Sequence, residues 1–140
     1  MAQITTFVTG DQEHETLGDR VGVMFKELDF SATNVDSGSN VQALKVGAGM
    51  LVLKAGVVIV TAEGSAASCD LGDSADSDGF EASINLNDTA GTNYQTVEGT
   101  DAYGAGRYYA SADTIDLMNV TGDLTVGKVR VWAIYVRLTT

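Results

Sequence analysis

The sequence predicts an all-β protein: an antiparallel β-sandwich, jelly-roll or Greek-key like, with about eight strands. Three observations support this class. Short runs rich in Val, Ile and Thr alternate with turn residues, and no segment shows a convincing helical period. The 140 residues include 16 glycines and no proline, so turns must be built from Gly, Asn, Asp and Ser. No period of 20 to 50 residues repeats, which argues against solenoids and propellers. We expect a polar N-terminal arm over residues 1–18 and a single β-sandwich domain over residues 19–140.

In the first half of the domain, strands are indicated by β-branched residues between glycines. Residues 21–30 have apolar residues at helical spacing, but Gly22 and the neighbouring valines favour a strand. Asn40 is a fair N-cap, so residues 40–46 are expected to form a helical turn. The remaining expectations are a loop at 31–40, strands at 50–53, 57–62 and 65–71, and a turn at 54–56.

Alternation gives the clearest strand signals in the second half. Residues 80–87 alternate apolar and polar side chains, which is typical of a strand with one dry face and one wet face. Residues 88–107 have no period and are predicted to form a long loop, a kind of segment that often carries contacts. Strand character resumes at 108–109 and 114–118. Residues 128–138 give the longest signal and are apolar on both faces, as in a central strand covered by the opposite sheet and by loops or a partner.

Composition and charge exclude several classes of function. The formal net charge is −11, which disfavours binding to nucleic acid or to anionic membranes. Cys69 is the single cysteine, so no intramolecular disulfide can form. No segment approaches the ~20 apolar residues of a membrane span, and the N-terminus lacks the regions of a signal peptide. We therefore expect a protein made in a cytoplasm.

An acidic stretch over residues 69–80 separates two apolar runs. Asp70, Asp73, Asp76 and Asp78 supply the hard oxygens that a calcium ion prefers, so this stretch is either a cation loop or a solvated hairpin turn. The helix–loop–helix calcium pattern fails, because Asn85 falls where a bidentate acid is needed and a strand follows. Without a cation, four nearby carboxylates repel one another and bind protons more readily than usual.

Catalytic and cofactor motifs find little support. His14 is the only histidine and lies in a polar segment, which disfavours a Ser-His-Asp or Cys-His arrangement and excludes a zinc site with several His or Cys ligands. No phosphate-binding glycine motif is present, and no particular carboxylate pair is indicated for hydrolysis. Tyrosines in and after the long loop, Tyr94 and Tyr103 among them, offer material for sugar binding, although strand tyrosines ordinarily pack internally. We expect no enzymatic activity and no required cofactor.

Several stretches together resemble small virion structural proteins of tailed bacteriophages. The resemblance runs from about residue 21 to the C-terminus, and its strongest part is the order of the aspartate-glycine loop, the Tyr-Tyr segment and the final valine-rich strand. The chain departs from it by having no proline before Ala48-Gly49. The matching stretches are FKELDFS (25–31), VQAL (41–44) followed by AG (48–49), VVIVTAE (57–63), CDLGDSADSDGF (69–80), RYYASADTID (107–116) and GKVRVWAIY (127–135).

The resemblance implies a head decoration (cement) or head-fibre role. Such a protein binds the major capsid protein on the outer shell as a small homo-oligomer, a dimer or trimer, and no catalytic residues carry over. We expect partner contacts from Ile4, Phe7 and Val8 in the arm and from Tyr94 and Tyr103 in the long loop. The alternatives are a receptor- or glycan-binding module of a tail or fibre, a tail-tube or connector component, and an acidic-site hydrolase.

Overall fold

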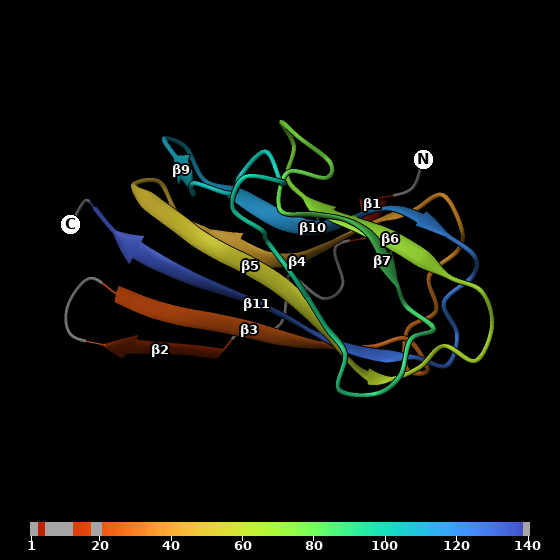
Figure 1. The fold of residues 1–140 in the computed structure, drawn as a ribbon. Helices are drawn as coiled ribbons and strands as arrows, with labels where there is room; N and C mark the ends of the chain where they lie inside the picture. Colours follow the sequence, from red (N-terminus) through yellow and green to blue (C-terminus); the bar gives the residue numbers. More distant parts are fainter. Residues whose placement is uncertain (1–2, 5–12, 18–20, 139–140) are drawn as a thin grey trace.

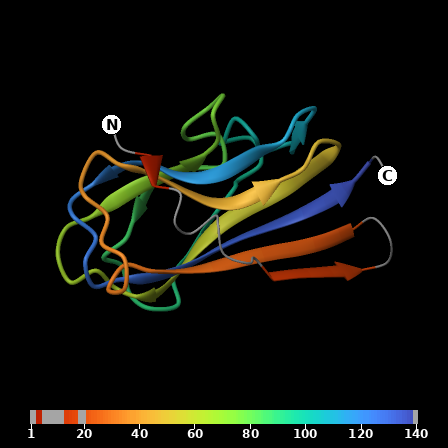
Figure 2. The ribbon, with the colours of Figure 1, turned by 180° about the vertical axis from the view of Figure 1, so that it is seen from behind.

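The computed structural model describes residues 3–4, 13–17 and 21–138 and places eleven strands in two facing sheets (Figure 1, Figure 2). We name each sheet after its central strand. The β10 sheet has the order β1 (Gln3–Ile4), β4 (Asn40–Val46), β10 (Asp113–Thr121), β6 (Ser68–Gly72) and β7 (Glu81–Asn85). The β11 sheet has the order β2 (Glu13–Leu17), β3 (Val21–Asp29), β11 (Lys128–Arg137), β5 (Met50–Thr61) and β8 (Asn93–Gln95), and β9 (Arg107–Tyr109) also pairs with β5.

The predicted antiparallel β-sandwich is confirmed. Every strand pairing is antiparallel except that of β1 with β4, which is parallel. Eight of the eleven strands span five or more residues, in line with the expected number. Over the described ranges the chain forms no helix, and so none that is long and apolar enough to cross a membrane.

The core lies between the two sheets and is built around β11. Val129, Val131, Ala133 and Tyr135 alternate along this strand and are all buried on its inner face. From the β10 sheet, Ile115 and Leu117 are fully buried as well. Inward-facing side chains of two sheets form such a core by interdigitation. The central position predicted for residues 128–138 is therefore confirmed.

Two local predictions are wrong, and tertiary contacts explain both. Residues 40–46 form strand β4, not a helical turn, because β10 pairs with them and buries Val41 and Leu44. The expected turn at 54–56 is the middle of the continuous twelve-residue strand β5. Gly56 there makes room for a neighbour: a Cβ atom on it would lie 2.6 Å from the Trp132 ring and 2.5 Å from the Tyr94 carbonyl oxygen. A glycine inside a strand marks such a close approach as readily as it marks a turn.

The remaining elements follow the sequence expectations with small additions. Residues 31–39 form turns, pinned by an isolated bridge between Val35 and Leu124. The segment 88–107 is mostly turns and irregular chain, as predicted, but it contributes the short strand β8 to the edge of the β11 sheet. Within 80–87, Phe80, Ile84 and Leu86 are buried as predicted, whereas Ala82 is only half-buried and a pairing irregularity lies beside it.

A buried glutamate holds the turn that leads into β11. Glu63 is 2% exposed, and its carboxylate accepts hydrogen bonds from the backbone N–H groups of Thr125, Val126 and Gly127. Three amide donors offset the burial of one carboxylate, since charge-assisted hydrogen bonds are stronger than neutral ones. The end of β5 and the start of β11 are thereby joined outside the strand ladder.

We expect Gly56→Ala to destabilise the protein by about 1–3 kcal/mol, as overpacking of a tight core typically does, because the new methyl group meets the Trp132 ring and a backbone carbonyl. Gly47→Ala is the matched control, since a Cβ atom there meets only the Met50 sulfur at 3.6 Å, an ordinary contact. Urea unfolding of both variants measures the difference. Equal stabilities would contradict the packing explanation for Gly56.

Candidate functional site: the acidic loop and the pocket beside it

The carboxylate of Asp73 lies at the centre of the acidic stretch. The residue is 1% exposed, and side chains more than 25 residues away in sequence converge on it. Tyr103 donates its hydroxyl to Oδ1 at 2.8 Å, Tyr109 donates its hydroxyl to Oδ2 at 2.8 Å, and Arg107 Nε donates to Oδ2 at 3.0 Å. Three donors from one later segment therefore close around a single acid.

The loop that carries Asp73 completes the set of donors. The backbone N–H groups of Ala75 and Asp76 each donate to Oδ1 at 3.0 Å. Gly79 then allows the later segment to approach, because a Cβ atom there would lie 2.3 Å from the Tyr103 ring. With five hydrogen bonds, the Asp73 carboxylate is saturated, and a buried group in that condition fixes the relative position of everything that binds it.

The pKa of Asp73 shows which influence dominates. Burial raises the pKa of a carboxyl group, but the hydrogen bonds from Tyr109, Tyr103, the Asp76 amide and Arg107 together hold the pKa of Asp73 below its usual value. The same network raises the pKa of Tyr103 and of Tyr109, chiefly by burial and then by their hydrogen bonds to Asp73. Asp73 is therefore charged and both tyrosines are neutral over the whole physiological range.

Arg107 is held by two aromatic rings as well as by the carboxylate. Its guanidinium carbon lies 4.9 Å from the centre of the Tyr103 ring and 5.1 Å from that of Tyr109, distances at which cation–π attraction operates. Tyr103 in turn meets Phe80 edge to face, with ring centres 4.9 Å apart. The acidic loop, the long loop and β9 are thus packed into one unit.

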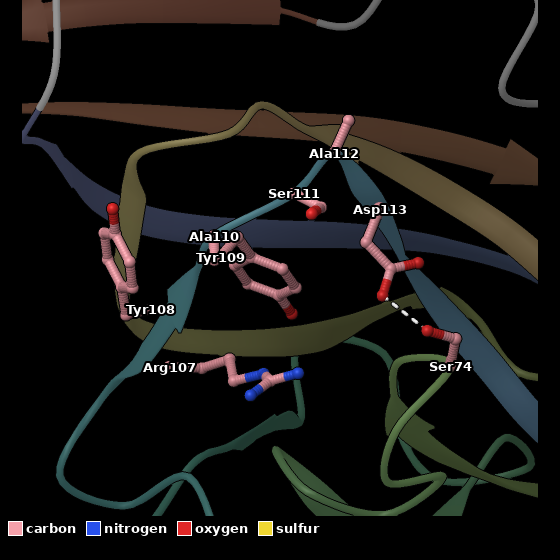
Figure 3. Close-up of a pocket in the computed structure, with 8 residues that line it drawn as sticks. All are labelled: Ser74, Arg107, Tyr108, Tyr109, Ala110, Ser111, Ala112 and Asp113. Atoms are coloured by element: carbon pink, nitrogen blue, oxygen red, sulfur yellow. Dashed lines mark hydrogen bonds between the residues drawn. The ribbon is translucent and has the colours of Figure 1, made fainter.

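A pocket of about 360 Å³ opens beside this unit (Figure 3). The Arg107 and Tyr109 side chains point into it from β9, and Ser74 donates a hydrogen bond to Asp113 Oδ2 at 2.7 Å across its other side. The lining is mostly polar, with an arginine whose charge Asp73 already balances. The geometry suits hydrogen bonding to a polar group better than binding of an apolar ligand.

Asp70 has a structural role on β6, between β10 and the edge strand β7 of the β10 sheet. Its Oδ1 accepts the backbone N–H of Ser83 at 2.9 Å, and its Oδ2 accepts the side-chain amide of Asn119 at 2.9 Å. Within the described ranges, Ser83 and Asn119 are the non-glycine residues that adopt positive φ, 57° and 54°, and both lie at irregularities in the pairing with β6. Asp70 therefore supports a bulge on each neighbouring strand, β7 and β10, where such a conformation needs local compensation.

The other two acids of the loop are close to each other: Asp76 is half-buried and Asp78 is exposed. A hydrogen bond shared with Asp76, then slight burial and the charges of Asp76 and Asp70, raise the pKa of Asp78. Mutual repulsion of carboxylates thus appears at Asp78, as expected, but not at Asp73. Among the described residues, no group of three or more His, Cys, Asp and Glu side chains is arranged to hold a metal ion. The cation-loop interpretation of Asp70, Asp73, Asp76 and Asp78 stays a prediction of the sequence.

A further buried acid, Asp116, lies on β10 and was not singled out by the sequence. It alternates with the core residues Ile115 and Leu117 and is 5% exposed. Its cross-strand neighbours are Gln42 on β4 and Gly72 on β6. Its Oδ1 atom has no hydrogen-bond partner among the described residues, which is unusual for a buried carboxyl oxygen.

Burial raises the pKa of Asp116 to about 7, although a hydrogen bond with Thr114 acts in the opposite direction. The nearby charges of Asp113 and Asp73 raise the pKa further, and a hydrogen bond with Gln3 lowers it. Asp116 is therefore the acid of the described chain whose charge is set to change near neutral pH. It contrasts with Asp73, which stays charged because its site supplies donors.

The predicted partner-binding residues lie in different environments. Tyr94 donates a hydrogen bond to Asp88 at 2.5 Å, and both Tyr94 and Tyr103 pack partly buried against the core. Ile4 belongs to β1 at the edge of the β10 sheet, whereas Phe7 and Val8 lie outside the described residues. The structure brings Tyr103 together with Asp73 but leaves Tyr94 apart from them, on β8.

Sequence reasoning missed Arg107 and Tyr109 as partners of the acidic loop. A signal was present: Arg107 is the only basic residue in the segment 88–107 of a strongly acidic chain, and a lone base in such a setting suggests a buried acidic partner. Tyr109 offered no comparable signal, because its hydroxyl is placed by the pairing of β9 with β5. For Asp116, strand alternation marked an outward position, and its burial depends on neighbours distant in sequence.

Comparison with known proteins identifies the fold. No protein-family model and no curated protein matches the sequence. Among solved structures, a chain of the capsid of Ralstonia phage GP4 matches 99% of this chain and 98% of its own length, with a TM-score of 0.68 and 13% identity. A chain of the cyanophage Pam1 capsid matches with a TM-score of 0.61 and 14% identity, and one of the acidic stable capsid of Helicobacter pylori bacteriophage KHP30 with 0.59 and 12%. Each of the latter two covers 92% of this chain and 94% of its own. This chain shares their fold over nearly its whole length.

We expect Asp73→Asn to destabilise the protein by about 3 kcal/mol, as is typical when one partner of a buried, hydrogen-bonded ion pair is removed. The amide leaves the Arg107 charge uncompensated. It also places an NH2 donor where the tyrosine hydroxyls need an acceptor. Asp78→Asn is the control in the same loop and should leave stability at pH 7 unchanged or slightly raised, because it relieves repulsion with Asp76. Thermal unfolding of both variants tests this, and a harmless Asp73→Asn would refute the organising role of the carboxylate.

Stability should fall as pH rises through about 7, because folded Asp116 holds a proton that the unfolded chain has already released. Between pH 5 and pH 8.5 the loss attributable to Asp116 is about 2–3 kcal/mol, at 1.4 kcal/mol for each pKa unit. Asp116→Asn stays neutral at every pH, so its stability relative to the parent protein should be greater at pH 8.5 than at pH 5. Urea titrations at both pH values measure this difference, and parallel pH profiles would show that Asp116 titrates normally.

Proposed function

We propose that this chain is a non-enzymatic structural protein of a bacteriophage particle. The observation that carries the proposal is the likeness in fold to chains of three phage capsids, which extends over nearly the full length of each chain. The structural role of the buried acids is consistent with this proposal. Asp73 and Glu63 are saturated by internal donors, so these carboxylates act as structural ties.

Within the particle, we propose a decoration (cement) role on the outer capsid surface, bridging subunits of the major capsid protein. A small, strongly acidic sandwich remains soluble at high concentration before it assembles. On a repeating shell, many modest contacts reinforce one another, because each bound copy occupies a site that recurs across the lattice. Such a protein needs complementary surfaces and not a reactive centre.

The partner contacts proposed from the sequence are the N-terminal residues Ile4, Phe7 and Val8, with Tyr94 and Tyr103 as secondary points. The partly buried packing of the two tyrosines gives them a supporting position, which leaves the N-terminal apolar residues as the stronger choice. Self-association as a dimer or trimer belongs to the same proposal.

The test is binding to purified shells that lack this protein. Phe7→Ser combined with Val8→Ser should weaken binding at least tenfold, as loss of apolar anchors typically does, while thermal unfolding stays unchanged. Tyr94→Phe is a control that keeps the ring and removes its hydrogen bond to Asp88. If the wild-type protein does not bind shells but binds host-surface polysaccharide, the result would favour the receptor-binding alternative. If it polymerises into tubes, the result would favour a tail-tube component.

A further inference from the structure

The outer face of the β11 sheet is apolar over much of its length. Residues paired across antiparallel strands share a face, so the register of β3, β11 and β5 defines rows of outward side chains. At one end of this face the rows are Phe25–Trp132–Gly56, Val23–Ile134–Lys54 and Val21–Val136–Leu51. These three rows thus present mostly aromatic and β-branched side chains on a face where solvent would ordinarily favour polar ones.

These side chains are accessible to solvent, and part of the face forms a groove. Phe25 is 39% exposed and Val21 is 36% exposed. A shallow groove of about 330 Å³ runs between β3 and β11, with Phe25, Trp132 and Ile134 among its lining residues. The Trp132 indole is fixed by donating to Asn93 Oδ1 at 3.0 Å and lies against Gly56. A preformed apolar groove with a held aromatic ring is typical of a contact surface.

Charge is distributed unevenly over this face. At its other end, Lys128 and Arg130 pair with Glu27, and Lys128 also lies 3.9 Å from Asp29. The Lys54 side chain, within the apolar end, makes no ion pair or hydrogen bond with any described residue. In a chain of net charge −11, an unpaired lysine among apolar side chains marks a place where an acidic group from outside is favoured.

The size of the face decides what kind of partner suits it. Three strands about 4.8 Å apart and about 30 Å long present roughly 430 Å² of surface, or about 900 Å² when a partner's share is added. A stable pair of free proteins ordinarily buries about 1,200 Å² or more. The three central strands alone therefore bury less than a stable free dimer ordinarily needs, and a contact of that size is sufficient where many copies bind one lattice.

We propose that the outer face of the β11 sheet docks onto an apolar surface of a shell subunit that places a carboxylate opposite Lys54. The inference rests on the proposed function and assigns a surface to it. Phe25, Trp132 and Ile134 supply the apolar contact, and Lys54 supplies the charge that sets the register of docking. Two copies of this chain are a poorer match, because each carries the same unpaired lysine and the same large negative charge.

The experiment measures the dissociation constant for purified shells that lack this protein, by co-sedimentation. Phe25→Ser and Ile134→Thr should each weaken binding at least tenfold. Val126→Thr is the control, because Val126 is 53% exposed and lies outside the strands that form this face, and it should stay within twofold of the parent protein. Lys54→Glu should weaken binding more than Lys54→Gln, and the gap should narrow as salt is raised.

The outcomes separate this inference from the proposed function. If the unaltered protein does not bind shells, the decoration role fails. If it binds and the face variants, Lys54→Glu included, bind equally well, the decoration role stands and this surface is wrong. Lys54→Glu keeps the test decisive should an apolar variant unfold, because the Lys54 side chain forms no ion pair or hydrogen bond with a described residue. A solution dimer that Phe25→Ser dissociates, with shell binding unchanged, would assign the face to a second copy and overturn the inference.

Discussion

A single buried carboxylate, that of Asp73, determines how the loops at one end of the sandwich are arranged. The strand ladders fix the two sheets, but they do not fix the acidic loop or the long segment before β9. Five hydrogen bonds to one acid do so, three of them from Tyr103, Arg107 and Tyr109. Because the donors come from side chains and backbone of separate segments, the carboxylate joins parts of the chain that pack weakly by themselves.

The strand framework was predictable because burial follows period two. The valine-rich C-terminal run and the alternation over 80–87 both indicate which face of the strand is buried in the core. Local signals misled where tertiary contact overrides them: Asn40 resembles a helix cap but begins a strand paired with β10, and Gly56 resembles a turn residue but makes room for Trp132. The Asp73 site was predictable only as an acidic cluster, because the role of this carboxylate depends on its contact with Arg107, 34 residues later in the sequence.

The carboxylates of this chain divide by the donors that their sites supply. Glu63 receives three backbone amides and Asp73 a cation and two hydroxyls, and these hydrogen bonds offset the burial of both carboxylates. Asp116 is buried with one oxygen unpartnered and keeps its proton near neutrality. On the outer face of the β11 sheet, Glu27 is paired with Lys128 and Arg130, while Phe25, Trp132 and Ile134 line an apolar groove that suits association.

The last long strand of the chain occupies the middle of its sheet. Since β11 lies between β3 and β5, neither neighbour can complete its hydrogen bonds until residues 128–137 have left the ribosome. Synthesis proceeds from the N-terminus, so a nascent or prematurely terminated chain exposes two unpaired strand edges, which are sites of aggregation and degradation. Folding of the β11 sheet thus depends on residues 128–137: a chain that lacks them cannot join β3 to β5.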